Sequence, residues 1–438
     1  MTVTAAQERC RLIAIWSWGL MAFCLPFSTA LTLTFSAFGV LFGLVGFDWA
    51  SLKIVMRHPI AILCVALFAW LALSMLWTIG TPDEMFEALS KYRKLLFVPL
   101  IAMLLISTRV RPRSIVKLFL AGCLVVCVGS LLSKFNLLTH LIGEELPTGG
   151  WGLGGDIDRP WFHIGPPHSP TFGRAWIAQG AFLALATTYF LAELSDSLQE
   201  NKSIGVSSLG LVICVLTTSF VNISLGGRTG IVLLAVSAVG WLAIFAVRKQ
   251  KRLFLCAFAF VFVAAVITIG YESIATSRIT SVVKEVTEYQ RFGTLTSQGI
   301  RLNFWNAALM SWLKYPLIGS GIGSFAESFK VLGQAPQALI DSRPHPHSEF
   351  ALQLVQGGVV AIFFYVALFS FAIRKAIFNK GIRSKNFQYR EFSLGLIIFL
   401  MFTNGFFNSV IWDLAEGHVI AIFLALAILP KKEENVEV

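Results

Sequence analysis

The chain has 438 residues, of which 56% are hydrophobic and 13% charged, and its formal net charge is +11. This composition excludes a soluble globular protein, because a chain of this length cannot bury so much apolar surface. Its long apolar runs do not alternate with polar residues as the strands of a membrane β-barrel do. We therefore expect an all-α, polytopic integral membrane protein.

Apolar runs that could cross about 30 Å of hydrocarbon recur along the whole chain. They predict about twelve transmembrane helices, at residues 12–27, 29–46, 59–78, 95–107, 115–135, 174–193, 206–224, 229–247, 253–271, 349–373, 391–411 and 415–429.

The positive charge is concentrated in short connections between the predicted spans, at residues 109–117, 248–252, 374–390 and 431–432. With an even number of spans, both termini and all of these clusters fall on the cytoplasmic side, as the positive-inside rule requires. The charge therefore indicates membrane topology rather than a nucleic-acid partner.

Two long segments fall on the outer side of a single transmembrane domain that spans residues 1–438. Residues 136–173 form the first outer loop and are rich in Gly, Pro, Trp and His. Residues 272–348 form the second and larger loop. Helical spacing of apolar residues predicts amphipathic helices at residues 281–288 and 302–313 of this loop, a turn-rich stretch at 316–323, and another amphipathic helix on the same side at 83–94.

A polar string at residues 343–350 lies where the second outer loop ends and an apolar helix begins. Ionisable groups at the mouth of a span usually face a cavity or a reaction site rather than lipid. His347 comes at the first turn of the incoming helix, where the helix dipole favours a neutral imidazole that can accept a proton. It is a candidate general base, with His345 as its support. The alternative is that His347 only caps the helix or lies at the headgroup level.

Three arginines are predicted at the outer ends of helices. Arg228 lies in the turn Gly226–Gly230, whose glycines let an anionic group approach the backbone, and its planar fork fits phosphate oxygens. Arg301 begins an amphipathic helix, and Arg174 opens the span after the first outer loop. Each could instead anchor the chain at the lipid headgroups.

Asp156 and Asp158 form an Asp-x-Asp in the first outer loop, similar to the pair that holds a divalent metal in nucleotide-sugar transferases. Nucleotide sugars are not expected outside the cytoplasm, so we assign the pair no role. The sequence has no glycine-rich nucleotide loop with a lysine, no His-Glu-x-x-His and no Gly-x-Ser-x-Gly. It predicts neither a metal nor a cofactor.

The dipeptide His347-Ser348, followed after nine residues by Gly358, resembles the histidine motif of the bacterial O-antigen ligases. Residues 301–309 and 316–325 resemble the large outer loop of the same superfamily, and residues 227–230 are similar to its arginine-containing turn. The resemblance covers the whole length in span count, topology and loop placement. The departures are Ala361, where the motif prefers Gly, Thr or Tyr, and Thr229, which stands where the family has a glycine.

The resemblance implies a GT-C-like glycosyltransferase in the bacterial inner membrane, with its active site facing the periplasm. It would move a polysaccharide from undecaprenyl diphosphate to a sugar hydroxyl of the lipid A core, with inversion and without a metal. His347 would be the general base, and Arg228 and Arg301 would hold the donor diphosphate and stabilise its charge as it leaves. Arg174, Arg343 and His345 would bind substrate. The implied partners are the lipid-linked donor, the lipid A core and membrane lipid, with no nucleic acid.

Other functions are open to a chain with this topology. O-antigen polymerases tend to carry an arginine followed eleven positions later by glycine in each large outer loop, and none of the outer arginines here has that spacing. Protein O-oligosaccharyltransferases usually have a large C-terminal extension. A transporter would place its polar residues near the midplane, whereas here they gather outside.

Overall fold

The computed structural model describes residues 5–135, 137, 151–156, 159–164, 170–174, 176–201, 205–251, 253, 284–289, 296–332, 345–378 and 387–429. This part of the chain is helical apart from one antiparallel hairpin in the first outer loop, in which β1 (Trp151–Asp156) pairs with β2 (Arg159–Ile164) so that Trp151 faces Ile164. The sequence did not predict this hairpin. The named helices are α1 (Ala5–Cys24), α2 (Thr29–Val45), α3 (Trp49–Val55), α4 (Pro59–Leu73), the 3₁₀ turn η1 (Ser74–Leu76), α5 (Pro82–Tyr92), α6 (Lys94–Thr108), α7 (Pro112–Lys134), α9 (Trp176–Asn201), α10 (Val206–Ser224), α11 (Arg228–Val247), α14 (Ser297–Lys314), α15 (Phe325–Leu332), α17 (Glu349–Phe378), α18 (Tyr389–Asn404) and α19 (Leu414–Ile428).

Eleven of the twelve predicted spans coincide with one of these helices, and the span predicted at 253–271 lies almost wholly outside the described residues. Six helices of the described part are long and apolar enough to cross a membrane by themselves, or seven if the bent pair α2–α3 counts as one span. The others are too short, too charged or too polar for that test, so the number twelve stays a prediction. The amphipathic helices predicted at 83–94 and 302–313 correspond to α5 and α14, and residues 284–289 are also helical.

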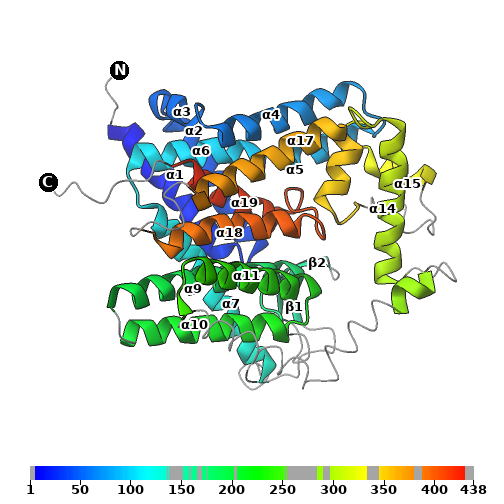
Figure 1. Cartoon of the computed structure of the whole chain (residues 1–438). Helices are drawn as coiled ribbons and strands as arrows, with labels where there is room; N and C mark the ends of the chain where they lie inside the picture. Colours follow the sequence, from blue (N-terminus) through cyan, green and yellow to red (C-terminus); the bar gives the residue numbers. More distant parts are fainter. Residues whose placement is uncertain are drawn as a thin grey trace.

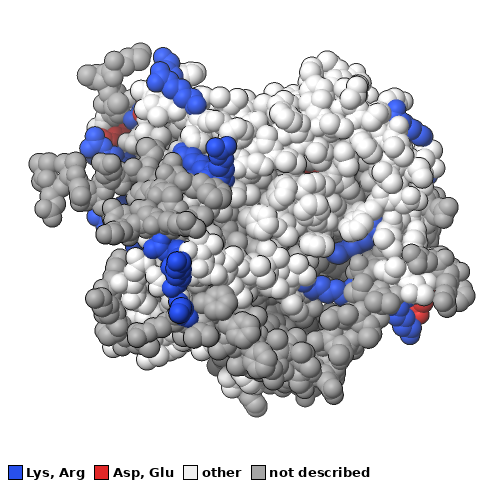
Figure 2. All heavy atoms as spheres, in the orientation of Figure 1, with Lys and Arg blue, Asp and Glu red and all other residues white. Residues whose placement is uncertain are grey.

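Most of the long helices run side by side in one direction, and α14 crosses one end of the bundle (Figure 1). Helices α9, α10 and α11 pack together as one group, which meets the rest through α7 and α18. Helix α19 is the centre of the larger group, because every residue from Ala415 to Ile428 is buried. On the face shown in Figure 2, Lys and Arg gather toward the two ends, and a wide band between them carries hardly any charge. This distribution suits a bundle that crosses a lipid bilayer.

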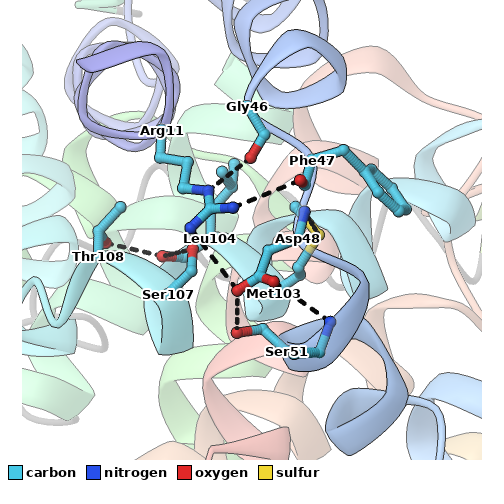
Figure 3. Close-up of polar contacts among 10 residues, drawn as sticks. Arg11, Gly46, Phe47, Asp48, Ser51, Met103, Leu104, Ser107 and Thr108 are labelled. Carbon is cyan, nitrogen blue, oxygen red and sulfur yellow. Dashed lines mark hydrogen bonds and ion pairs between the residues drawn. The ribbon is translucent and has the colours of Figure 1, made fainter. Parts of the chain in front are cut away.

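Helices α2 and α3 meet at an angle of 113° at the end of the bundle where α1 begins. Arg11 of α1 points into this corner and donates from Nε to the carbonyl of Gly46 (2.6 Å), while its Nη1 lies 3.7 Å from Asp48 Oδ2 (Figure 3). Asp48 also accepts hydrogen bonds from Ala50 N and Ser51 Oγ and so caps α3. The buried arginine thus satisfies a carbonyl left free at the end of α2 and fixes the bend.

Helix α17 is interrupted at Gly358, whose φ of 65° and ψ of −159° are accessible only to glycine. The break frees backbone groups that the turn-rich loop 316–323 satisfies. Ser320 N donates to the Val355 carbonyl (2.7 Å), and Val359 N donates to the Pro316 carbonyl (3.0 Å). A Cβ on Gly358 would lie 2.3 Å from the Leu317 oxygen. The glycine of the histidine motif therefore locks the outer loop onto the start of α17.

Candidate active site

His347 lies in the short segment that leads into α17, at the end of the bundle crossed by α14. Its φ is +48°, a left-handed conformation that costs a non-glycine residue about 1–2 kcal/mol. The segment is held on both sides: Trp305 of α14 donates from Nε1 to the Pro346 carbonyl (3.0 Å), and Ser348 Oγ donates to the Gly405 carbonyl (3.4 Å). Strain that the surroundings maintain in this way is common at functional sites.

Glu349, the next residue but one, is fully buried at the N-terminus of α17. Its Oε1 accepts hydrogen bonds from Gln353 Nε2 (2.8 Å) and Tyr92 OH (3.1 Å). Its Oε2 accepts from the amides of Ile411 (2.9 Å) and Trp412 (3.4 Å). A buried carboxylate is tolerated only when donors surround it. Glu349 therefore ties α17 to α5 and to the loop before α19.

The imidazole of His347 is packed among other rings. Its centroid lies 4.1 Å from that of His345 and 6.2 Å from that of Phe304. His345 in turn bonds through Nδ1 to Ser409 Oγ (3.2 Å) and stacks on Trp412 at 6.3 Å. In the part of the chain that the structure describes, no hydrogen bond reaches a ring nitrogen of His347. The ring is thus fixed by packing while its nitrogens stay available to a ligand.

Arg301 lies in the first turns of α14, and its charge acts on the imidazole of His347. Burial, followed by the positive charge of Arg301, lowers the pKa of His347 from 6.5 to about 4. The histidine is therefore neutral at physiological pH. Burial and the charge of Arg228 likewise lower the pKa of Arg301 below its ordinary value. Among the described residues no carboxylate forms an ion pair with Arg301, so its charge favours an anion beside the neutral histidine.

Arg228 is the first residue of α11, after the turn in which Gly226 has a φ of +67°. Its Nη2 lies 3.2 Å from Glu285 Oε1, and its side chain is 32% exposed. A helix N-terminus already carries free amides and a partial positive charge. An arginine at this position extends the positive field toward Arg301, with Glu285 as a counter-charge that an incoming phosphate would have to replace.

Arg174 has a different environment. Its Nε donates to the Leu25 carbonyl (2.7 Å), its Nη1 to Thr29 Oγ1 (3.0 Å), and its Nη2 to the Ser28 carbonyl and Thr32 Oγ1 (both 3.2 Å). The guanidinium holds the turn between α1 and α2. It therefore has little capacity left for a phosphate, and the structure does not bring it into contact with His347.

The remaining predicted residues can be placed only in part. Arg343 and Asp158 lie outside the described residues, and Asp156 ends β1 with a side chain that is not described. Within the described ranges no three His, Cys, Asp or Glu side chains are grouped as metal ligands. The independence from metal and cofactor stays a prediction.

Sequence reasoning missed the buried supports of the site. Tyr92, at the end of α5, and Ser409, before α19, are far from the histidines in sequence and adjacent in space. Lys94 donates to the carbonyls of Trp412 (2.9 Å) and Asp413 (2.7 Å) from the other side of the same loop. A lysine and a tyrosine beside an apolar run were the only sequence signal, and such residues are common at membrane interfaces.

This arrangement can carry out acid–base chemistry beside an anion. A neutral imidazole can accept a proton from a hydroxyl group, and two guanidinium groups can bind and stabilise a phosphate that gains charge.

The apolar helices and charged ends define a multi-pass membrane protein. Residues 212–366 match the family model described as O-antigen ligase, a range that includes Arg228, Arg301, His345 and His347. This part of the chain is therefore similar to the O-antigen ligase family. A search of the curated proteins finds no match to the chain.

Proposed function

We propose that the protein transfers an O-antigen polysaccharide from undecaprenyl diphosphate to a sugar hydroxyl of the lipid A core, at the periplasmic face of the bacterial inner membrane. The observation that carries this proposal is the strained and packed His347, whose pKa is lowered by burial and by the charge of Arg301, which in turn lies within the field of Arg228. The family match supports the reaction class.

In the proposed reaction His347 accepts the proton of the acceptor hydroxyl as its oxygen attacks the anomeric carbon of the donor sugar. The bond between that carbon and the diphosphate oxygen breaks, and undecaprenyl diphosphate leaves with the electron pair. Arg301 and Arg228 stabilise the charge that grows on this leaving group. A single displacement of this kind inverts the anomeric centre. The proton is then released from His347.

The diphosphate has a second effect on the base. A pKa of about 4 makes His347 a weak base in the empty site. A bound diphosphate offsets the charge of Arg301, which is one of the two causes of that low pKa. The donor would therefore raise the pKa of His347 toward the operating pH, so that the base is strengthened only when there is a sugar to transfer.

The test is lipopolysaccharide banding from cells that lack this gene, complemented with the wild type or with His347→Ala. We expect the variant to lose the ladder while long glycan accumulates on undecaprenyl diphosphate. His58→Asn is a matched control, because His58 caps α4 near Lys375 and asparagine is also a good helix cap. We expect it to keep the ladder.

The other outcomes are informative. A single repeat unit on the core in cells without the gene would indicate a polymerase. An unchanged ladder in the His347→Ala strain, at normal protein level, would contradict the proposed base. An unchanged ladder in the gene deletion itself would contradict the glycosyltransferase and favour a transporter.

A further inference from the structure

The bundle has a cavity of about 700 Å³ at the end away from His347. Its mouth is formed by the turn between α6 and α7 and by the last residues of α17 and α19. Helix α17 connects the two ends: Glu349 supports the histidine site, and Lys375 donates to the Ile428 carbonyl (2.8 Å) beside the cavity. Glu349 and Lys375 are 26 positions apart, which is roughly 40 Å of helix less what the break at Gly358 removes, so the cavity is separate from the proposed active site.

The walls and the rim of the cavity differ in chemistry. Leu105, Val116 and Phe423 are among the apolar side chains of its wall. Five cationic residues also line it, and Glu391 is the one acidic side chain among the described lining residues; the cationic ones are Arg109, Arg111, Arg113, Lys375 and Arg390. The cavity therefore offers an apolar interior and a net positive opening.

The five cations are not equivalent. Arg390 is neutralised by α9, since its Nε lies 2.8 Å from Asp196 Oδ2 and its Nη1 lies 3.5 Å from Glu193 Oε2. Lys375 bonds to the end of α19. Arg109 and Arg111 are both exposed, and in the described part of the chain neither forms an ion pair. Two arginines, two residues apart, are thus available to an anion at the cavity mouth.

The backbone gives an independent reason to regard Arg109 as functional. It ends α6 in the left-handed conformation, with a φ of 56° and a ψ of 15°. Glycine is the usual residue at such a helix end, and an arginine there costs about 1 kcal/mol. The strain places a long cationic side chain at the cavity mouth where a glycine would have served the fold better.

We propose that this cavity binds an anionic glycerophospholipid of the surrounding membrane, with its phosphate on Arg109 and Arg111 and an acyl chain along Leu105, Val116 and Phe423. The cavity lies where α6 and α19 end and α7 begins, which is the level at which hydrocarbon meets headgroups. Basic pockets between transmembrane helices are suited to anionic headgroups. This proposal does not depend on the transferase reaction.

The experiment is native mass spectrometry of the full-length protein in detergent, titrated with dioleoyl-phosphatidylglycerol or with dioleoyl-phosphatidylcholine. We expect the anionic lipid to bind at least tenfold more tightly. Removal of both charges in Arg109→Gly/Arg111→Gln should weaken its binding by roughly 25-fold, or about fivefold per arginine, and leave the neutral lipid unaffected. Glycine suits the backbone at position 109, so this variant is expected to fold.

The matched control is Arg9→Gln/Lys53→Gln, which removes two exposed charges near the same end of the bundle but outside the cavity lining. It should retain the preference for the anionic lipid. Equal binding of the two lipids, or a preference that survives in Arg109→Gly/Arg111→Gln, would overturn the proposal. Glycerol 3-phosphate is the third titrant, and binding as tight as that of the whole lipid would identify a small-anion site instead.

Discussion

Two arginines that look alike in the sequence have opposite environments in the fold. Arg174 and Arg301 both stand at the predicted outer end of a helix, and both are candidates for phosphate binding. The first donates four hydrogen bonds to the turn between α1 and α2. The second forms no ion pair with a carboxylate among the described residues, and burial and the charge of Arg228 lower its pKa. A buried arginine with satisfied donors stabilises a fold, whereas one held without counter-charges stores the capacity to bind an anion.

The comparison predicts the largest effect at Arg301. Arg301→Gln should reduce the rate of glycan transfer by roughly 100- to 1,000-fold, because it removes a preformed charge at the leaving group. The melting temperature should not fall, since two like charges no longer face each other. Transfer from a lipid-linked donor by purified protein measures the rate, and Lys314→Gln, on the exposed end of the same helix, is the control. A variant that retains half of the rate would contradict the assignment.

Glu349 should give the next largest effect, on both stability and rate. Glu349→Gln keeps the shape of the side chain but replaces one carboxylate oxygen with an NH2 group. This donor would face the amides of Ile411 and Trp412, or the hydroxyl of Tyr92, where an acceptor is needed. An unsatisfied buried donor costs about 1–3 kcal/mol. We expect a lower melting temperature and a lower kcat at temperatures where the protein is folded, because the histidine segment is no longer fixed. Glu327→Gln, which affects only an ion pair with Lys330 on α15, should change neither.

Arg174 is predicted to affect stability alone. Arg174→Met leaves the Leu25 carbonyl without its donor, at a cost of about 1–3 kcal/mol, whereas the Ser28 carbonyl keeps its hydrogen bonds from Thr32. The melting temperature should fall clearly, while kcat measured well below it should remain within about twofold of the wild type. Arg57→Met, an exposed arginine at the other end of the bundle, controls for loss of charge. Loss of transfer by a folded Arg174→Met protein would instead support the predicted role of Arg174 in substrate binding.

The smallest effect is a difference between two pH profiles. The depressed pKa keeps His347 neutral at pH 7, so activity should be lost only as the pH falls through the pKa. For kcat/KM, which reports the empty enzyme, this acid limb should lie near pH 4. For kcat, which reports the donor complex, it should lie at higher pH. In Arg301→Gln the acid limb of kcat/KM should move to higher pH. The move should be less than half of the distance from about 4 to 6.5, since burial is the larger cause of the low pKa of His347. If the acid limbs of kcat and kcat/KM lie at the same pH, the donor diphosphate does not raise the pKa of His347, contrary to the proposal.

The sequence by itself determined the helices and the residues worth attention. Apolar length predicts spans whatever their neighbours are, because a helix satisfies its own backbone in lipid. Eleven predicted spans therefore have a helix in the structure, and His347, Arg228 and Arg301 could be singled out from charge and glycine placement. The strict requirement for glycine at position 358 could be read from its motif, but its cause, the contact with the loop at 316–323, could not.

The tertiary structure alone decided which of these candidate residues lie near one another. Arg228, Arg301 and His347 are separated by 46 residues or more along the chain, and only the tertiary fold brings Arg301 within electrostatic reach of both Arg228 and His347. The fold also places the guanidinium of Arg174 on a turn about 145 residues away in sequence, where its donors are hydrogen-bonded. It surrounds Glu349 with donors from α5 and from the loop before α19. Helix formation depends on neighbours three and four positions apart, which a sequence displays. Partnership between charges depends on distance in space and on the water excluded around them, which a sequence does not display.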